Sequence, residues 1–334
     1  MATDEDNGEA TTVTGQKVAA VIYNPIKVDL DAIKAAVATE ESNAGWGPTL
    51  YYETSKEDPG QGAAERAIAD GVDMVIAAGG DGTVRAIAEV VYKSEASLGL
   101  LPSGTGNLLA RNLKLTLEDL DHSIHTAFSG DDRAIDIGAI ELRREDHSIT
   151  RHSFLVMAGL GLDAKMLANT DEDLKKKVCW LAYVGAIVKA LRDKNDLRMR
   201  YNLDDKGVRS VRAHTIIIGN CGALQANVLL LPEAAVDDGL FEIVIFRPEG
   251  FVGWVQIAVK VFWENGVLRR LRFGKKLMTD EVDSLRYIKG KELTVRLSRA
   301  EQVELDGDGF GNAVALKTWV EPGALRVRVP AEGE

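Results

Sequence analysis

The sequence predicts a two-domain protein. The expected N-terminal α/β domain has a parallel sheet with helices on both faces, and the C-terminal domain is mainly antiparallel and β-sandwich-like. Short apolar runs alternate with helical patterns up to about residue 131, and this alternation is typical of a parallel sheet. Short runs of alternating polarity follow from residue 133, which indicates antiparallel strands. The chain has 334 residues, enough for two domains.

The overall composition limits the classes of function. The chain is 46% hydrophobic and 27% charged, so it can bury ordinary cores. Its net charge of −11 argues against a nucleic-acid binder, and it opposes adsorption to an anionic membrane unless positive charge is clustered locally. Two cysteines without metal-type spacing favour reduced thiols in the cytoplasm. We find no signal peptide and no apolar run of about 18–20 residues, so we expect a cytoplasmic protein that is at most peripheral at the inner face of the membrane.

The expected N-terminal domain spans residues 16–131, after a disordered tail at 1–15. Strands are predicted at residues 17–23, 49–54, 72–78 and 98–101, with helices at 30–41, 63–70, 84–92 and 108–112 between and after them. Ligands of such sheets bind beyond the carboxyl ends of the strands. Asn24 and Lys27 follow the first strand and Thr54 ends the second, so we expect them at this edge.

A glycine-rich loop joins the third strand to the next helix, with the sequence Gly79-Gly80-Asp81-Gly82-Thr83. Glycines let backbone N–H groups approach a ligand closely, and a helix start attracts anions, so the loop suits phosphate. Asp81 would repel phosphate unless a cation or a hydroxyl donor lies between them, which indicates a magnesium nucleotide or an acid acting on a nucleophile. The alternative is a plain strand-to-helix turn with Asp81 near the N-cap.

A second loop of small residues follows the fourth strand, at residues 102–107. The hydroxyl of Thr105 and the amide of Asn107 suit a phosphate or a ribose. Two such loops at one edge of a sheet favour a nucleotide site.

The expected C-terminal domain spans residues 132–316, and residues 317–330 are expected to return to the first domain. Strands are predicted at 134–142, 152–158, 197–202, 213–219, 240–247, 293–297, 302–305, 317–320 and 325–329, with helices at 174–192 and 250–266. The second helix has an aromatic face and a basic stretch after it. It is either a core helix with a solvated, cation-rich end or a membrane-facing patch.

The ordered set of motifs resembles the diacylglycerol kinase catalytic family, in the soluble bacterial branch related to sphingosine and ceramide kinases. Residues 79–83 look like its GGDGT, and residues 102–111 look like its P-x-GTGN-x-x-AR string. Further matches are residues 158–164 (G-x-G-x-D-A), 180–183 (LAY), 232–240 (P-x-A-x-x-DGL) and 305–308 (DGE). The resemblance covers residues 17–330.

The resemblance implies a two-domain kinase that uses Mg²⁺ and moves the γ-phosphate of ATP onto a lipid hydroxyl. The default acceptor is diacylglycerol, which would give phosphatidic acid. Asp308 would accept the proton of the hydroxyl, and Asp306 could share that role. Asp81 would help to hold Mg²⁺. The expected cofactor-binding residues are Asn24, Pro25, Lys27, Thr54, Gly79, Gly80, Asp81, Gly82, Thr83, Val84, Arg85, Gly104, Thr105, Gly106 and Asn107. A structural magnesium loop is implied at Asp238, with backbone oxygens of Ala235 and Leu240.

Three departures from the family pattern are visible. Lys27 stands in a first loop that reads Asn-Pro-Ile-Lys rather than Asn-Pro-x-Ser-Gly, Leu108 stands where diacylglycerol kinases usually have Asp, and Asp308 replaces Glu. The alternatives are an NAD kinase-like enzyme, which shares the glycine loop, and a non-catalytic nucleotide- or lipid-binding regulator. We expect the partner to be a lipid substrate at a membrane surface rather than a nucleic acid, and a homodimer is compatible with the sequence.

Overall fold

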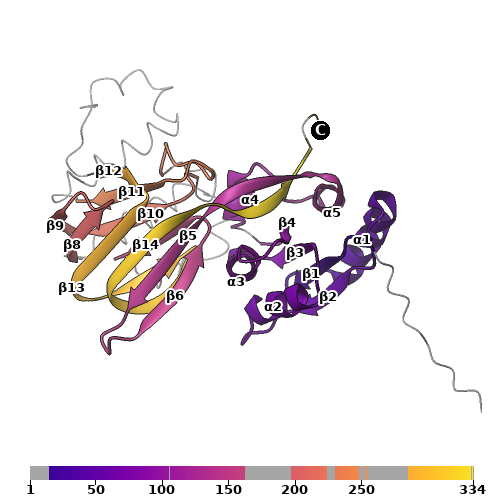
Figure 1. The fold of residues 1–334 in the computed structure, drawn as a ribbon, viewed down its shortest axis with the longest axis horizontal. Helices are drawn as coiled ribbons and strands as arrows, with labels where there is room; N and C mark the ends of the chain where they lie inside the picture. The colour runs from indigo at the N-terminus through magenta and orange to yellow at the C-terminus, as the bar shows by residue number, and fades with distance from the viewer. Residues whose placement is uncertain are drawn as a thin grey trace, which may run out of the picture.

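The computed structural model describes residues 15–104, 106–161, 197–223, 230–247, 253, 285–331 and 333. The expected tail before residue 15, Thr105, and the expected helices at 174–192 and 250–266 lie outside these residues, apart from residue 253 in the second helix. Two bodies are apparent, one of helices around a small sheet and one of long strands (Figure 1). None of the described helices is both long and apolar enough to cross a bilayer.

The N-terminal sheet is parallel in the order β4-β3-β1-β2. Its strands are β1 (Ala19–Tyr23), β2 (Leu50–Glu53), β3 (Met74–Gly79) and β4 (Ser97–Pro102). The helices are α1 (Leu30–Ala44), α2 (Gln61–Ala69), α3 (Asp81–Val91), α4 (Leu108–Asn112) and α5 (Leu120–Ser129).

Helices cover both faces of this sheet. Alternate strand residues point to opposite sides, so each strand contributes to two cores. Ala20 and Val75 pack in one core cluster with α2 and α3. Val21 and Ile76 pack in another with α1 and α5. The predicted parallel sheet with helices on both faces is confirmed.

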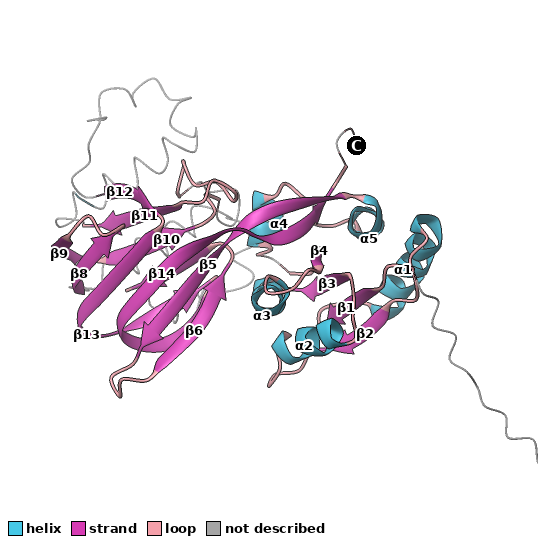
Figure 2. Ribbon diagram, viewed as in Figure 1, coloured by secondary structure: helices cyan, strands magenta, loops and turns pink. Residues whose placement is uncertain are grey.

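The second body is antiparallel, as predicted. One run of strands has the order β9-β8-β13-β14-β5-β6 (Figure 2). A second run has the order β12-β11-β10-β7-β13. The strands are β5 (Asp131–Arg143), β6 (Ile149–Phe154), β7 (Met157–Leu160), β8 (Leu197–Leu203), β9 (Val208–Ala213), β10 (Thr215–Gly219), β11 (Phe241–Phe246), β12 (Leu285–Gly290), β13 (Glu292–Leu305) and β14 (Asp308–Val329).

β13 belongs to both runs of strands. Its first half, residues 293–297, pairs with β8, and its end, residues 303–305, pairs with β7. Register shifts against β14 lie between these two halves, and such bulges bend a strand. The two layers formed in this way enclose a shared apolar core that includes Phe154, Phe241 and Leu293.

β14 links the two bodies. It is one continuous strand of 22 residues, where the sequence predicts separate strands at 317–320 and 325–329. A register shift between Glu321 and Leu325 marks the place where the pattern breaks. Beyond it, Val327 pairs in parallel with Leu98 of β4. The domain limits at 16–131, 132–316 and 317–330 stay predictions.

Candidate nucleotide and acceptor site

The carboxyl ends of the parallel strands are tied together by backbone hydrogen bonds. Asn24 N–H donates to Ala78 O at 3.0 Å, and Thr54 N–H donates to Tyr23 O at 2.9 Å. Ser103 N–H donates to Gly79 O at 3.1 Å. The loops after β1, β2, β3 and β4 therefore meet at one edge of the sheet, and the structure brings together the predicted residues that they carry.

In the glycine-rich loop after β3, close packing requires a glycine at position 79, and the charged ends of two side chains lie beside the other two glycines. A Cβ at Gly79 would lie 2.7 Å from the Thr83 side chain, and one at Gly80 would lie 3.0 Å from Lys27 Nζ. A Cβ at Gly82 would lie 2.8 Å from Asp308 Oδ2. The loop thus has an ammonium group beside Gly80 and a carboxylate beside Gly82, at the N-terminus of α3. Val84 lies in the first turn of that helix.

Asp81 connects the two loops. Its carboxylate accepts hydrogen bonds from the backbone N–H groups of Asn107 (2.9 Å) and Leu108 (2.6 Å), at the start of α4. Burial raises the pKa of Asp81, and these amide donors oppose that rise. Because each carboxylate oxygen already accepts an amide hydrogen, this arrangement suits a positioning role better than direct metal binding.

The second loop is held by its own polar side chains. Asn107 has a left-handed backbone (φ 50°), and its side-chain amide donates to Gly104 O at 3.0 Å. Arg111 Nε donates to Gly106 O at 2.7 Å. Asn112 also exchanges hydrogen bonds with the backbone of Ala223, which connects α4 to the segment after β10. Thr105 lies outside the described residues.

The two aspartates of the late turn face different surroundings. Asp306 is buried, and its carboxylate accepts the N–H groups of Leu155, Val156 and Met157 at 2.8–2.9 Å. Burial raises its pKa to about 6, even though the three amides lower it. The Asp308 side chain is 51% exposed and lies against Gly82. Of the two, Asp308 is the one that can reach a substrate.

Arg85 lies between the glycine loop and the β-rich body. Its side chain is only 6% exposed, and Nη2 lies 3.4 Å from Asp308 Oδ2. The guanidinium carbon lies 4.5 Å from the centre of the Phe310 ring, and Nη1 lies 3.7 Å from Glu89. Nε and Nη1 have no hydrogen-bond partner among the described residues. The guanidinium is therefore directed at Asp308 rather than at the glycine loop itself.

His152 completes this group. Its ring lies 4.7 Å from the Phe310 ring, and Nδ1 lies 3.9 Å from Glu89. Burial and the nearby Arg85 lower the pKa of His152, which favours the neutral imidazole. Sequence reasoning missed Glu89, His152 and Phe310. No local pattern could have found them, since they meet only through the packing of α3, β6 and β14.

The implied magnesium loop precedes β11. Leu240 N–H donates to Asp238 Oδ1 at 3.0 Å, and both residues share this loop with Ala235. The buried Asp136, which the sequence did not single out, accepts hydrogen bonds from the N–H groups of Gly239 and Gly323 and so fixes the loop. The oxygen donors fit a hard cation such as Mg²⁺. Among the described residues, no group of three His, Cys, Asp or Glu side chains gathers at one point.

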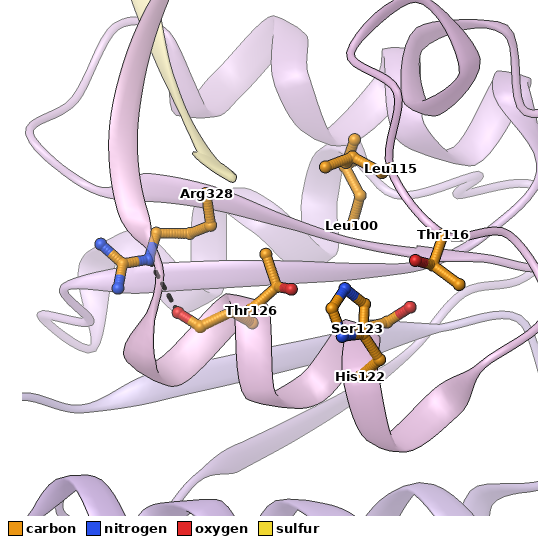
Figure 3. Close-up of a pocket in the computed structure, with 8 residues that line it drawn as sticks. Leu100, Leu115, Thr116, His122, Ser123, Thr126 and Arg328 are labelled. Atoms are coloured by element: carbon orange, nitrogen blue, oxygen red, sulfur yellow. Dashed lines mark hydrogen bonds between the residues drawn. The ribbon is translucent and has the colours of Figure 1, made fainter. Parts of the chain in front are cut away.

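The described part of the N-terminal body includes a small hollow and a larger one. The one in Figure 3 lies between β4, α5 and the end of β14, where Arg328 Nε donates to Ala127 O. Its volume of about 10 Å³ admits no more than a water molecule. The other, of about 230 Å³, is bordered by Lys27, Pro102 and Ser103, so it adjoins the loops after β1 and β4.

Comparison with known proteins assigns both parts of the chain. Residues 18–140 match the model of the diacylglycerol kinase catalytic domain, and residues 155–329 match the YegS C-terminal NAD kinase beta sandwich-like domain. The chain is 30% identical over 307 residues to a probable lipid kinase YegS-like of Pseudomonas aeruginosa, covering 90% of each chain. It is 25% identical over 300 residues to a diacylglycerol kinase of Bacillus subtilis, covering 88% of this chain and 91% of that one.

The fold also matches solved structures. A putative diacylglycerol kinase from Bacillus anthracis superposes with a TM-score of 0.68 at 20% identity, covering 94% of this chain and 96% of that one. A yeast NADH kinase complexed with NADH superposes with a TM-score of 0.53 at 9% identity, covering 96% of this chain and 85% of that one. At these identities, the likeness establishes the shared architecture alone.

Proposed function

The chain belongs to the family of YegS-like and diacylglycerol kinase-like lipid kinases, and from this premise we propose that it transfers the γ-phosphate of ATP to a lipid hydroxyl. The observation that carries the proposal is the position of Asp308. Its half-exposed carboxylate lies against Gly82, at the start of α3, so a base stands beside the loop that would hold the phosphates. Phosphoryl transfer depends on such positioning and on charge neutralisation.

ATP would occupy the edge formed by the loops after β1 to β4. The N-terminus of α3 and Lys27 would attract the phosphates, and Asp81 would keep the second loop in place through its two amide contacts. Mg²⁺ bound with ATP would offset the phosphate charge, and the loop at Ala235, Asp238 and Leu240 would hold a separate, structural ion. Asp308 would orient the acceptor hydroxyl and take its proton. Asp306 would support the strand turn without meeting the substrate.

Diacylglycerol is the proposed acceptor, and phosphatidic acid the product. A relative named as a diacylglycerol kinase supports this choice over other lipid alcohols. An NAD kinase-like activity is supported only by the fold likeness to the yeast NADH kinase.

A labelled-ATP assay separates these functions. Purified protein would be incubated with Mg²⁺ and mixed micelles of diacylglycerol, phosphatidylglycerol, sphingosine or ceramide, with NAD as a soluble acceptor. We expect label in the organic-phase product of diacylglycerol. Label in the product of another lipid would support the lipid kinase assignment but replace diacylglycerol as the acceptor. Label only in the NAD reaction would overturn the lipid kinase assignment. Binding of ATP without transfer to any acceptor would favour a non-catalytic regulator.

Lys27→Gln is expected to raise the KM for ATP about tenfold, because a hydrogen bond to a charged phosphate contributes at least about 1.5 kcal/mol. The KM for the lipid should not change. Steady-state kinetics with each substrate varied in turn measures both. Lys34→Gln, on the exposed side of α1, is the matched control. An unchanged KM for ATP would remove Lys27 from the nucleotide site.

Arg85→Met is expected to lower kcat about 10–100-fold with little change in either KM, because the apolar side chain can still pack on Phe310 but no longer holds Asp308. If Arg85 acts through Asp308, the double variant with Asp308→Asn should be no slower than Asp308→Asn alone. Arg66→Met is the control. Arg66 lies on α2, and it also pairs with an aspartate (Asp58) and lies over an aromatic ring (Tyr52). Losses that multiply in the double variant would contradict the positioning role.

A further inference from the structure

The sheet β9-β8-β13-β14-β5-β6 has one face that does not pack on the apolar core. Leu293, Val295 and Met199 point into that core, so their strand neighbours point outward. The register places these neighbours on one surface: Arg198 is opposite Arg212, and Arg200 is opposite Arg296. Through Ala315 of β14, the same row continues to Arg143 of β5.

We call this surface the arginine face and define it by five exposed residues: Arg143, Arg198, Arg200, Arg212 and Arg296. The face also includes Glu141 and Glu292, but each of these carboxylates is already paired. Glu141 pairs with Arg151 at 2.7 Å, and Glu292 pairs with Lys317 at 3.0 Å. Arg143, Arg200, Arg212 and Arg296 therefore leave a local excess of positive charge on the outer side of the sheet.

This clustering opposes folding and runs against the composition of the chain. Like charges directly opposite each other on neighbouring strands are destabilising. The chain as a whole has a net charge of −11, so scattered surface arginines would have many acidic neighbours. Here Arg200 stands directly opposite Arg296 instead. An anionic partner would remove this repulsion.

Apolar side chains on the same face indicate which anionic partner fits. Val208 is 69% exposed and lies opposite Asn202, on the outward side of β8. Ile149 is 51% exposed and lies opposite Arg143. These are two of the three large hydrophobic residues that are exposed among the described residues, and they stand at the two edges of the face. Cations together with exposed apolar groups suit a lipid interface, where the apolar side chains can be buried. The phosphate backbone of a polynucleotide would pair with the arginines but would not bury the valine and the isoleucine.

We propose that the arginine face docks the protein onto a bilayer that contains anionic phospholipids, with Val208 and Ile149 at the headgroup boundary. The arginines supply the local positive charge that adsorption to an anionic membrane needs. The net charge of −11 would otherwise oppose this adsorption. The biological sense of this docking rests on the proposed lipid kinase function, since the acceptor resides in a bilayer. The docking itself does not require turnover, so the two can be tested separately.

The test is co-sedimentation of the full chain with vesicles, without ATP or acceptor lipid. Vesicles of phosphatidylglycerol mixed with phosphatidylcholine would be compared with phosphatidylcholine alone, at low ionic strength and at about 1 M salt, where the screening length is about 3 Å. We expect binding to the anionic vesicles only, and its loss in high salt. Each arginine near an anionic surface contributes about a fivefold gain in partition, so Arg200→Gln with Arg296→Gln should lose about 25-fold.

The matched control removes the same charge elsewhere, with Lys34→Gln and Arg66→Gln on the exposed sides of α1 and α2. It should bind as the wild type does. Because Arg200→Gln with Arg296→Gln also removes a like-charge pair, its melting temperature should not fall, which excludes misfolding as the cause of lost binding. Equal binding by the two double variants, or equal binding to neutral vesicles, would overturn the proposal. A single-stranded RNA held more tightly than the anionic vesicles would overturn the assignment to lipid.

Discussion

Asp308→Asn is expected to lower kcat by about 10²–10⁴-fold, because a positioned general base contributes that much to a proton transfer. The amide keeps the size of the side chain and its contact with Gly82, but it cannot accept the proton of the acceptor hydroxyl. The KM for ATP should stay within about twofold, since in the proposed mechanism Asp308 contacts the acceptor hydroxyl and not ATP. Initial rates with saturating ATP and varied lipid give both constants.

The design includes a control and a rescue. Asp205→Asn removes an equal charge from the turn after β8, where Asp205 accepts a hydrogen bond from Asn202, and it should keep wild-type kinetics. Asp308→Glu keeps the carboxylate and should recover part of the rate. A fully active Asp308→Asn protein would move the base to another residue, and the buried Asp306 would then have to be reconsidered.

Asp306→Ala is expected to lower the free energy of unfolding by about 3–5 kcal/mol, because it leaves two buried N–H groups and one partly buried N–H group without an acceptor. These amides belong to Leu155 and Val156, which connect β6 to β7, and to Met157, the first residue of β7. Urea unfolding followed by tryptophan fluorescence measures the change. If the protein folds at low temperature, its kcat should fall far less than that of Asp308→Asn.

Asp204→Ala is the matched control for this effect. Asp204 also has a left-handed backbone, with φ of 50° against 49° for Asp306, and it also accepts backbone N–H groups, from Lys291 and Glu292. It differs in being partly exposed, so water can replace its carboxylate. We expect Asp204→Ala to cost about 1 kcal/mol. Equal losses in the two variants would mean that burial does not determine the importance of Asp306.

The parallel sheet and its ligand-binding edge could be predicted because their signals are local. Each strand is a short apolar run, and each loop carries its glycines and polar residues within a few positions. The strand boundaries inside the β-rich body were harder to predict, because they depend on contacts with residues that are distant in sequence. The predicted strand at 152–158 is divided at residues 155–156, where the backbone turns toward Asp306, about 150 positions away.

The same reason separates the two late aspartates. In sequence, Asp306 and Asp308 are equivalent neighbours of one turn, and either could be the base. Only the packing of β7 against the end of β13 buries the first, and only the approach of α3 brings Gly82 to the second. The family resemblance implies that Arg85 is among the ATP contacts, and this stays a prediction. Its guanidinium lies against Phe310 and Asp308, and no spacing in the sequence could reveal these contacts.

The long last strand has a consequence for the order in which the chain can fold. β4 is flanked by β3 on one side and by the end of β14 on the other, so the first sheet needs Val327 to be complete. During synthesis, the edge of β4 next to Leu98 therefore stays unpaired until Val327 has been made. This requires more than 220 further residues. An open strand edge is a template for wrong pairing. A release of the nascent chain shortly before residue 325 should therefore give a product that aggregates, although both cores are almost fully encoded.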